Sequence, residues 1–231
     1  MGLRSPHEGK SLPAPSVLDE SPAVLKTAGL SKRIRKEAIF DDVSLSFPKG
    51  GVTAITGQNG AGKTTLAQIL CGLARQTRGH ILIDGKKARA AVRRREIYYC
   101  GNDTSTQFFT ASVAEELLLN TELTEESKSR ARNLLNELGL YKYRDAHPSA
   151  LSGGQKQRLA IACAIFSCRR ILILDEPTSG LDGQNMRLIA ERLKSEARNG
   201  RTILVITHDR ELIESCCDNV VEVGTKPSEV Q

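Results

Sequence analysis

The stretch that decides the fold is Gly57-Gln58-Asn59-Gly60-Ala61-Gly62-Lys63-Thr64. It fits the pattern G-x-x-x-x-G-K-[ST] and stands between an apolar run at 52–56, typical of a buried strand, and a predicted helix from Lys63 to about Gly72. The glycines let the backbone curl so that successive N–H groups face phosphate oxygens, and the positive end of the helix dipole adds to that attraction. A chance glycine-rich turn would not need this strand–loop–helix setting. We therefore predict a loop that binds the phosphates of a nucleoside triphosphate.

Two side chains at the end of this loop have distinct predicted roles. Lys63 would place a positive charge on the β- and γ-phosphates, and the Thr64 hydroxyl would ligate Mg²⁺. The residues expected to contact the nucleotide here are Gly57, Gln58, Asn59, Gly60, Ala61, Gly62, Lys63, Thr64 and Thr65.

A pair of carboxylates follows a second apolar run. Asp175 and Glu176 come directly after Ile171–Leu174, which has the continuous apolar character of a strand in a parallel sheet. Neighbouring side chains of a strand point to opposite sides, so the two carboxylates can serve different purposes. We assign Asp175 to holding Mg²⁺ through water and Glu176 to acting as the general base on the attacking water. Taken alone, Asp-Glu-Pro after a strand is as often a solvated turn, and the phosphate loop upstream favours the catalytic interpretation.

A second glycine-lined helix start lies at Leu151-Ser152-Gly153-Gly154-Gln155. Ser152 is a good N-cap for a helix from about 155 to 167, and the two glycines leave backbone N–H groups open. A plain capped helix is the simpler interpretation. Such a terminus is also an anion site, and it makes sense as a grip on the γ-phosphate held by another subunit. The residues assigned to this grip are Ser152, Gly153, Gly154 and Gln155.

The order of the predicted elements indicates an α/β fold. Residues 39–47 alternate apolar and polar side chains like one half-buried strand, and another apolar strand at 202–207 follows a helix at about 183–199. The segment from about 104 to 168 is helical in character. One of its helices shows an apolar face formed by Ala131, Leu134, Leu135 and Leu138. Strands alternating with helices imply an α/β sheet with a helical insertion.

These stretches together resemble the ATP-binding subunit of ABC transporters over residues 26–224. The resemblance rests on five ordered elements, which are Gly57–Thr64, Leu151–Gln155, Ile171–Glu176, Ser179–Asp182 and Thr207–Asp209. It implies a P-loop ATPase fold with a mostly parallel core sheet, an N-terminal antiparallel β part and a helical subdomain. It further implies ATP as the nucleotide, Asp182 in a loop that couples the two sites of a head-to-tail dimer, and His208 in contact with the γ-phosphate. A lone histidine after a strand is more often structural, and its place in the ordered set favours the catalytic role.

Two positions depart from the pattern of that family. Its glutamine that contacts Mg²⁺ and the attacking water is matched here by Asn102, which keeps the amide but reaches about 1.2–1.5 Å less far. We keep Asn102 as a catalytic and metal-contacting residue, with a weaker contact or a closer loop as the open consequences. The aromatic ring that stacks on adenine has no counterpart at 30–35, where Ile34 or a flanking arginine could cover the base.

The segment that begins at Asn102 indicates a branch of the family. Residues 102–109 resemble the Q-N-P-x-x-Q-[apolar]-F stretch of energy-coupling-factor ATPases, which drive vitamin and cobalt or nickel uptake, with Asn102 and Gln107 at the two glutamine positions. Any ABC importer subunit could look similar, and that alternative stays open. The expected partners are a second ATPase subunit, identical or different, and integral membrane transporter subunits.

Composition excludes a membrane-spanning or secreted chain. The 231 residues are 39% hydrophobic and 26% charged, and no apolar run approaches the ~20 residues that cross a bilayer. No apolar signal sequence stands at the N-terminus. We expect a cytoplasmic protein, peripheral on the inner face of the cell membrane. Residues 1–23 are expected to be a disordered leader or a linker between two fused ATPase halves, and residues 24–231 the ATPase domain.

Charge leaves one alternative function open. The net charge of +6 suits anionic partners, and basic side chains cluster at 32–36 and 86–95. A soluble ABC-type ATPase acting on nucleic acid or the ribosome is the alternative, although such runs more commonly form solvated faces. The span between Lys63 and Ser152 is too short for the long coiled coil of chromosome-structuring relatives. We therefore expect an ATPase that powers transport through membrane subunits, with nucleic acid disfavoured as a partner.

Overall fold

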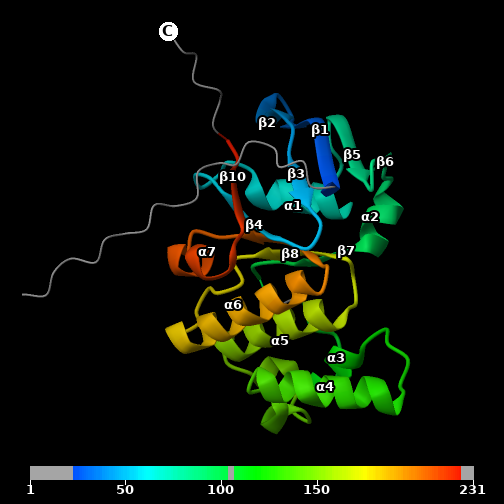
Figure 1. Ribbon diagram of the computed structural model, residues 1–231, viewed down its shortest axis with the longest axis vertical. Coiled ribbons are helices and arrows are strands. Elements are labelled where there is room, and N and C mark those ends of the chain that lie inside the picture. Colours follow the sequence, from blue (N-terminus) through cyan, green and yellow to red (C-terminus); the bar gives the residue numbers. More distant parts are fainter. Residues whose placement is uncertain (1–22, 104–106, 225–231) are drawn as a thin grey trace, which may run out of the picture.

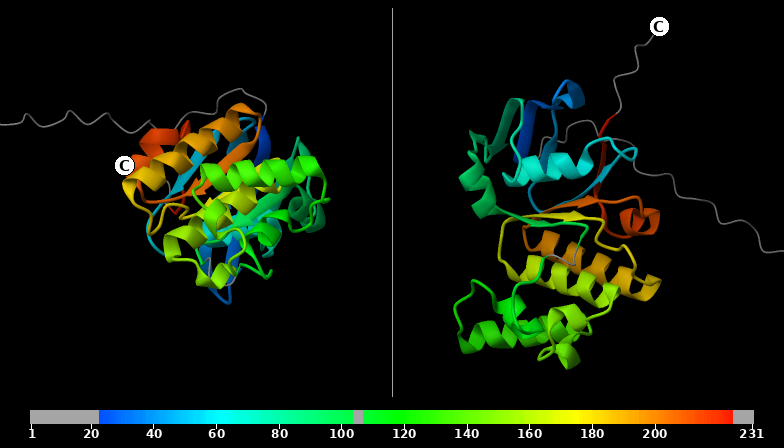
Figure 2. Two further views of the ribbon diagram at one scale, coloured as in Figure 1. Left: turned by 90° about the horizontal axis from the view of Figure 1, so that it is seen from below. Right: turned by 180° about the vertical axis from the view of Figure 1, so that it is seen from behind.

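The computed structural model describes residues 23–103 and 107–224. Along its longest axis follow an antiparallel sheet, helix α1, a parallel sheet, helices α5 and α6, and finally α3 and α4 (Figures 1 and 2). The predicted leader at 1–23 lies outside the described residues except for Ala23, which begins the first strand. Within the described ranges, no helix combines the length and the apolar character that a membrane span needs.

The central sheet is parallel throughout. Its strands are ordered β10-β4-β9-β8-β7. Their bounds are β4 Val52–Thr56, β7 Ile97–Cys100, β8 Ile171–Asp175, β9 Thr202–Ile206 and β10 Asn219–Glu222. Every residue of β8 and β9 is buried, because helices cover both faces of a parallel sheet. The strands predicted at 52–56, 171–174 and 202–207 are confirmed to within one residue, and the first two lead into the phosphate loop and the acidic pair.

The second sheet is the expected N-terminal antiparallel part. Its order is β2-β1-β5-β6, and β3 pairs with β1. The bounds are β1 Ala23–Ile34, β2 Glu37–Val43, β3 Ser46–Pro48, β5 Arg78–Ile83 and β6 Lys86–Lys87. This sheet lies over α1 and away from the helices at the other end of the molecule (Figure 1).

The prediction of one strand over 39–47 was wrong. The chain forms β2 up to Val43 and then a separate short strand, β3, that begins at Ser46. Between them, the Thr27 hydroxyl donates to the Val43 carbonyl (3.0 Å) and accepts from the Leu45 N–H (2.8 Å). The Thr27 side chain of β1 therefore satisfies backbone groups at the junction between β2 and β3. The alternation of apolar and polar residues continues through 39–47, although the strand itself is interrupted there.

Seven α-helices and two 3₁₀ turns occupy the described residues. They are α1 Lys63–Cys71, α2 Ala90–Glu96, α3 Val113–Leu118, α4 Glu125–Glu137, η2 Tyr141–Tyr143, η3 Pro148–Ala150, α5 Gly153–Phe166, α6 Gly183–Arg198 and α7 Arg210–Cys216. The predicted apolar face of α4 is confirmed as buried, and Gly139 adopts φ +65° just beyond its end. Helix α2 has no counterpart among the elements predicted from the sequence.

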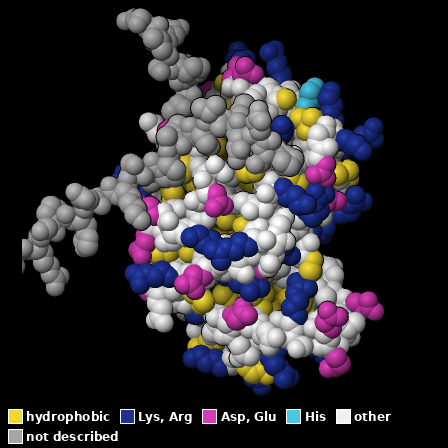
Figure 3. All heavy atoms as spheres, in the orientation of Figure 1, with side chains coloured by type: hydrophobic (Ala, Val, Ile, Leu, Met, Phe, Trp, Pro, Cys, Tyr) yellow, Lys and Arg dark blue, Asp and Glu magenta, His cyan; other side chains and the backbone are white. Residues whose placement is uncertain are grey.

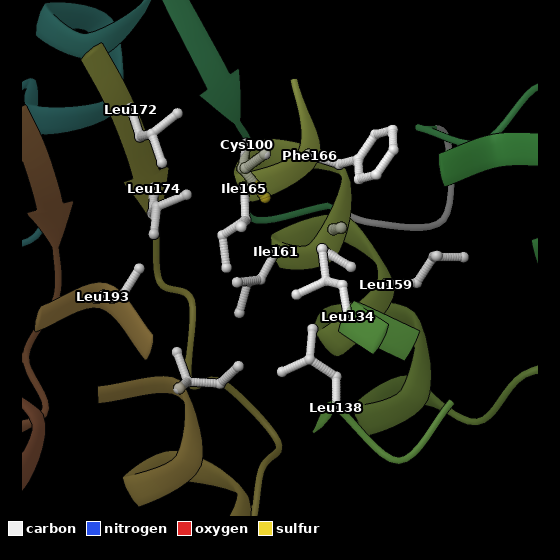
Figure 4. Close-up of a cluster of buried hydrophobic side chains, with 14 of the residues drawn as sticks. Cys100, Leu134, Leu138, Leu159, Ile161, Ile165, Phe166, Leu172, Leu174 and Leu193 are labelled. Atoms are coloured by element: carbon white, nitrogen blue, oxygen red, sulfur yellow. The ribbon is translucent and has the colours of Figure 1, made fainter. Parts of the chain in front are cut away.

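Two hydrophobic cores lie on opposite faces of the parallel sheet. Leu172 and Leu174 of β8 pack with α3 to α6, whereas Ile171 and Ile173 pack with α1 and the antiparallel sheet. This division follows from the alternation of side chains along a strand. Figure 4 shows the first core, where side chains of β8 meet α5 and Leu134 and Leu138 from the α4 region. The sheet is thus held from both sides, and its carboxyl edge is a rigid support for the site.

Candidate nucleotide-binding site

The phosphate loop connects β4 to α1 and fits only glycine at two positions. Gly57 has φ +140°, and a Cβ there would overlap the Val223 carbonyl oxygen. Gly62 has φ +89°, and a Cβ there would lie 2.5 Å from Ile39 Cγ2. The loop therefore packs between strand β2 and the segment that follows β10. Both the lack of space for a side chain and the positive φ angles account for glycine at these two positions.

Lys63 is held inside the curve of the loop. Its side chain is 8% exposed, and its Nζ donates to the carbonyl oxygens of Gly57 (2.7 Å) and Gln58 (3.0 Å). These hydrogen bonds to the loop's own backbone therefore hold the ammonium group at the start of α1. A fixed positive charge in this position is what binding of a phosphate chain requires.

Thr64, which follows Lys63 in α1, contacts Asp175 at the end of β8. The Thr64 hydroxyl donates to Asp175 Oδ2 at 2.7 Å, and Asp175 is only 2% exposed. Tyr99 of β7 also donates its hydroxyl to the same Oδ2, at 3.2 Å. Burial, followed by the charge of Asp175, raises the pKa of Tyr99, so the phenol stays protonated and remains a donor. Sequence reasoning missed Tyr99, because only the strand order places β7 next to β8.

Glu176 occupies a strained position at the end of β8. Its φ is +50°, a region that residues other than glycine rarely adopt. Its N–H donates to the Ile206 carbonyl (2.8 Å), and Gln157 Nε2 donates to its carbonyl oxygen (3.2 Å). Hydrogen bonds from β9 and α5 therefore fix the backbone that aims this carboxylate.

The carboxylate of Glu176 faces the loop after β9. The Thr207 hydroxyl donates to Oε2 at 3.3 Å, and His208 Nε2 lies 3.8 Å from Oε1. Burial raises the pKa of Glu176, and the neighbouring His208 and Thr207 partly oppose that rise. The geometry thus brings together the predicted base and the predicted histidine, which are far apart in the sequence.

A hollow of about 360 Å³ gathers most of the predicted residues. Those lining it are Asn59, Gly60, Gly62, Lys63, Thr64, Thr65, Asn102, Asp175, Glu176 and His208, together with Ile39 and Ile206. Ile34, which we expected as one cover for the base, is 52% exposed and does not line the hollow, whereas Ile39 does. No sequence signal distinguished Ile39 from other apolar residues of β2.

Asn102 and Gln107 separate in the structure. Asn102 lines the hollow. Gln107 instead donates through Nε2 to the carbonyl oxygens of Gly101 (3.0 Å) and Asp103 (2.9 Å). Of the two positions that suggested a branch of the family, only the first therefore reaches the nucleotide site, and the second braces the backbone beside it.

The predicted second grip lies elsewhere on the same chain. Gln155 Oε1 accepts from the Ser152 N–H at 2.8 Å, so the glutamine caps the start of α5. A Cβ on Gly154 would lie 3.3 Å from Leu181 Cδ2, which brings this helix start against the loop before α6. At that loop, Asp182 Oδ1 accepts from the Asn185 N–H at 2.8 Å. Ser152–Gln155 and Asp182 are thus grouped, and none of them lines the hollow that contains Lys63.

These observations define the class of protein. A glycine loop between a parallel strand and a helix, a Thr–Asp pair and a glutamate at the end of strand β8 of the same sheet together form the site of a P-loop nucleoside triphosphatase. The family model described as "ABC transporter" matches residues 40–179. The chain belongs to this family.

Comparison with individual proteins agrees with this assignment. A candidate ABC transporter ATP-binding protein of Treponema denticola is 40% identical over 83% of this chain and 39% of its own length. The candidate HMP/thiamine import ATP-binding protein YkoD of Bacillus subtilis is 35% identical over 86% of this chain and 37% of its own length. The chain therefore spans about two fifths of the length of these relatives.

Solved structures show the same fold. CbiO1 of Clostridium perfringens, part of the ABC transporter complex CbiONQ, superposes with a TM-score of 0.74 at 33% identity, covering 88% of this chain and 85% of that one. The predicted ABC ATPase fold is therefore confirmed. The comparisons do not favour the alternative of an ATPase acting on nucleic acid or the ribosome.

Proposed function

We propose that this chain is the ATP-binding and ATP-hydrolysing subunit of an ABC transporter. The observation that carries the proposal is the convergence in one hollow of the Lys63 ammonium, the Thr64–Asp175 pair and the Glu176 carboxylate. These groups come from two parts of the chain, the start of α1 and the end of β8. Phosphoryl transfer requires binding of the phosphate charge, placement of a metal ion and activation of water. Lys63, the Thr64–Asp175 pair and Glu176 would meet these three requirements in turn.

The residues at the start of α1 and at the end of β8 fit a Mg²⁺–ATP complex. Thr64 and Asp175 present a hydroxyl and a carboxylate, which are the hard oxygen donors that Mg²⁺ takes from proteins when phosphates and water complete its shell. When bound, Mg²⁺ would neutralise phosphate charge and hold the β- and γ-phosphates in place. Lys63 would bind the same phosphates from the side of the loop, and Asn102 lines the space where they would lie.

Glu176 is the proposed general base. It would accept one proton from the attacking water, whose oxygen bonds to the γ-phosphorus while the bond to the β-phosphate oxygen breaks, giving ADP and phosphate. The raised pKa of Glu176 makes its carboxylate a stronger base than a solvated one. Thr207 and His208 would hold this carboxylate and, for His208, contact the γ-phosphate.

The second grip supports a head-to-tail dimer. Ser152 and Gly153 stand at the N-terminus of α5, which has 14 residues and so a well-developed dipole. Because they do not line the hollow of their own chain, they are available to a γ-phosphate held by a second ATPase subunit. Asp182 caps the helix that begins beside Gly154 and would link the two sites across the dimer.

A groove next to Gln107 is suited to a membrane partner. It lies beside α3 and includes two exposed apolar side chains, Phe109 (81%) and Leu119 (45%). The Phe109 N–H donates to Glu116 Oε2 at 2.8 Å, so this hydrogen bond holds the backbone while the phenyl ring is exposed to solvent. Gln107 lines the groove and braces Gly101, next to Asn102 in the nucleotide hollow. We place a helix of an integral membrane subunit in this groove, with the hydrogen bond from Gln107 to Gly101 as the link to ATP.

The importer branch is the finer part of the proposal. CbiO1 belongs to a transporter complex, and YkoD is named for import. With the residue pattern at 102–109, these similarities support an energy-coupling-factor type importer, with this chain cytoplasmic and peripheral on the inner membrane face.

Purification from membranes tests the proposal. The tagged chain is expressed in cells, membranes are solubilised in detergent, and integral proteins that co-purify are identified by mass spectrometry. We expect transporter subunits to be recovered with the parent chain and lost with Phe109→Asp, while Mg²⁺-dependent phosphate release disappears in Lys63→Ala. Recovery of ribosomes or DNA in place of membrane subunits would support the nucleic-acid alternative and overturn the transporter role.

A further inference from the structure

A second hollow opens at the end of α1 opposite the phosphate loop. It measures about 760 Å³ and lies between the end of α1, the β5–β6 hairpin and the start of α2. Its basic side chains are Arg75, His80, Lys87, Arg89 and Arg93, and within the described residues no carboxylate lines it. We call it the basic hollow. The nine residues of α1 separate it from the phosphate loop by about 13 Å, at 1.5 Å per residue.

Arg93 is the feature that marks the basic hollow as more than a charged surface. Its side chain is 4% exposed, and its Nη1 donates to the Ala88 carbonyl oxygen at 2.8 Å. Its Nε is buried and has no hydrogen-bond partner among the described residues. The same residues give it no ion pair with a carboxylate. Burying a guanidinium without a counter-charge is costly, and an anion bound in the hollow would supply that counter-charge.

The rim of the hollow carries further donors. Lys87 Nζ lies 3.2 Å from His80 Nε2. Because an ammonium group only donates, His80 Nε2 accepts this hydrogen bond, and the remaining N–H groups of Lys87 are free to turn to a ligand. Arg89 and Arg75 are exposed on the same rim. Lys and Arg side chains predominate over β6 and α2 in the space-filling view (Figure 3).

We propose that the basic hollow binds the phosphate group of an organic phosphate. Guanidinium and ammonium groups are the donors that recognise phosphate oxygens, and a buried arginine with rim cations is suited to a dianion. Part of the wall of the hollow is apolar, with Ile81 buried and Leu73 60% exposed, and this part accommodates the carbon part of the ligand. This chemistry is shared by a soluble phosphate ester and by the headgroup of an anionic phospholipid.

The proposal explains part of the basic run at 86–95, which the nucleotide site does not use. Lys87, Arg89 and Arg93 line the hollow, whereas Arg95 does not and instead lies 3.3 Å from Glu96. Arg95 is therefore a matched control, since it is an exposed arginine close to Arg89 that does not line the hollow.

Binding of inorganic pyrophosphate is the first test. The probe is titrated calorimetrically into the full chain carrying Lys63→Ala, so that the ammonium group of the phosphate loop is absent. We expect saturable binding that K87Q/R89Q weakens by roughly tenfold or more, as the loss of charge-assisted hydrogen bonds predicts. R95Q should change the affinity by less than about twofold, as for a screened exposed pair. R93M should also weaken binding, with circular dichroism reporting whether that variant folds.

Co-sedimentation with vesicles distinguishes the two sources of phosphate. Phosphatidylcholine vesicles with and without phosphatidic acid are compared, using the same variants. Sedimentation that needs phosphatidic acid and is lost in K87Q/R89Q but not in R95Q assigns the site to a headgroup. Pyrophosphate binding without such sedimentation assigns it to a soluble phosphate ester. Absence of saturable binding to either probe, or equal loss in R95Q, overturns the proposal.

Discussion

The Thr64 hydroxyl lies 2.7 Å from Asp175 Oδ2, although 111 positions separate the two residues in the chain. The contact joins the first turn of α1 to the last residue of β8. It therefore fixes the phosphate loop against the acidic pair and presents two hard oxygens to one point. The proposed hydrolysis depends on that relationship, because the metal, the phosphates and the water must all be placed relative to it.

Removal of the Thr64 hydroxyl should weaken the use of Mg²⁺. We expect Thr64→Ala to lower phosphate release roughly 10–100-fold, the range found when groups that support a metal are removed, and to raise the Mg²⁺ concentration needed for half-maximal activity. Thr64→Ser keeps the hydroxyl and should retain most of the activity. Phosphate release measured across a Mg²⁺ titration checks this. Equal behaviour of the two variants would show that the hydroxyl has no part in metal binding.

Glu176→Gln should separate binding from hydrolysis. The amide cannot accept the proton of the attacking water, so we expect a loss of roughly 10²–10⁴ in turnover, the usual contribution of a general base, with ATP affinity retained. The bound nucleotide should then hold a dimer together, visible by size-exclusion chromatography with Mg²⁺–ATP. Lys63→Ala serves as the control that loses the nucleotide itself. Turnover by Glu176→Gln at the parental rate would exclude Glu176 as the base.

The sequence predicted the parts of the site that act locally. The loop at 57–64 and the pair Asp175–Glu176 each follow a strand whose apolar run is continuous, and such runs are read directly from the chain. The predicted N-cap role of Ser152 is local as well, since the capping contact with Gln155 lies within three residues.

The parts that were missed depend on strand order or on side chains from other elements. Tyr99 reaches Asp175 because β7 pairs with β8, and Ile39 reaches the loop because β2 packs on Gly62. The break after Val43 depends on Thr27, which belongs to a different strand. The periodicity of the sequence cannot predict these contacts, because each contact joins segments that only the complete fold brings side by side.

Tyr99→Phe tests the contact that sequence reasoning missed. The substitution removes one donor from a carboxylate that is 2% exposed, so we expect a loss of about 1–2 kcal/mol in the free energy of unfolding. The Mg²⁺ dependence should shift in the same direction as for Thr64→Ala, because Tyr99 helps to orient Asp175. Tyr98→Phe is the matched control, since Tyr98 packs in the core on the other face of the sheet. An unchanged Mg²⁺ dependence with a loss of stability would limit Tyr99 to a structural role.

Asp84 gives the fold a pH-dependent contact at the turn between β5 and β6. Its carboxylate accepts from Arg170 Nη1 (2.9 Å) and Nη2 (3.0 Å), which joins this turn to the residue before β8. The hydrogen bond and charge of Arg170 lower the pKa of Asp84 below its ordinary value of 3.8. A carboxyl group with a lowered pKa in the folded state stabilises the fold above its unfolded pKa, and this stabilisation is lost as the pH falls through the folded pKa.

Asp84→Asn should therefore destabilise the protein at neutral pH and have a smaller effect in acid. Asparagine tolerates the positive φ of +49° at this position, so the turn keeps its backbone and only the charge is lost. Because both side chains are about half exposed, we expect about 0.2–1 kcal/mol at neutral pH. Urea unfolding at neutral pH and at a pH near 3.8 measures the difference. Asp145→Asn is the control, since among the described residues the ion pair of Asp145 is with its chain neighbour Arg144. A difference that stays constant between the two pH values would mean that the ion pair with Arg170 does not contribute, and that the substitution acts through the turn itself.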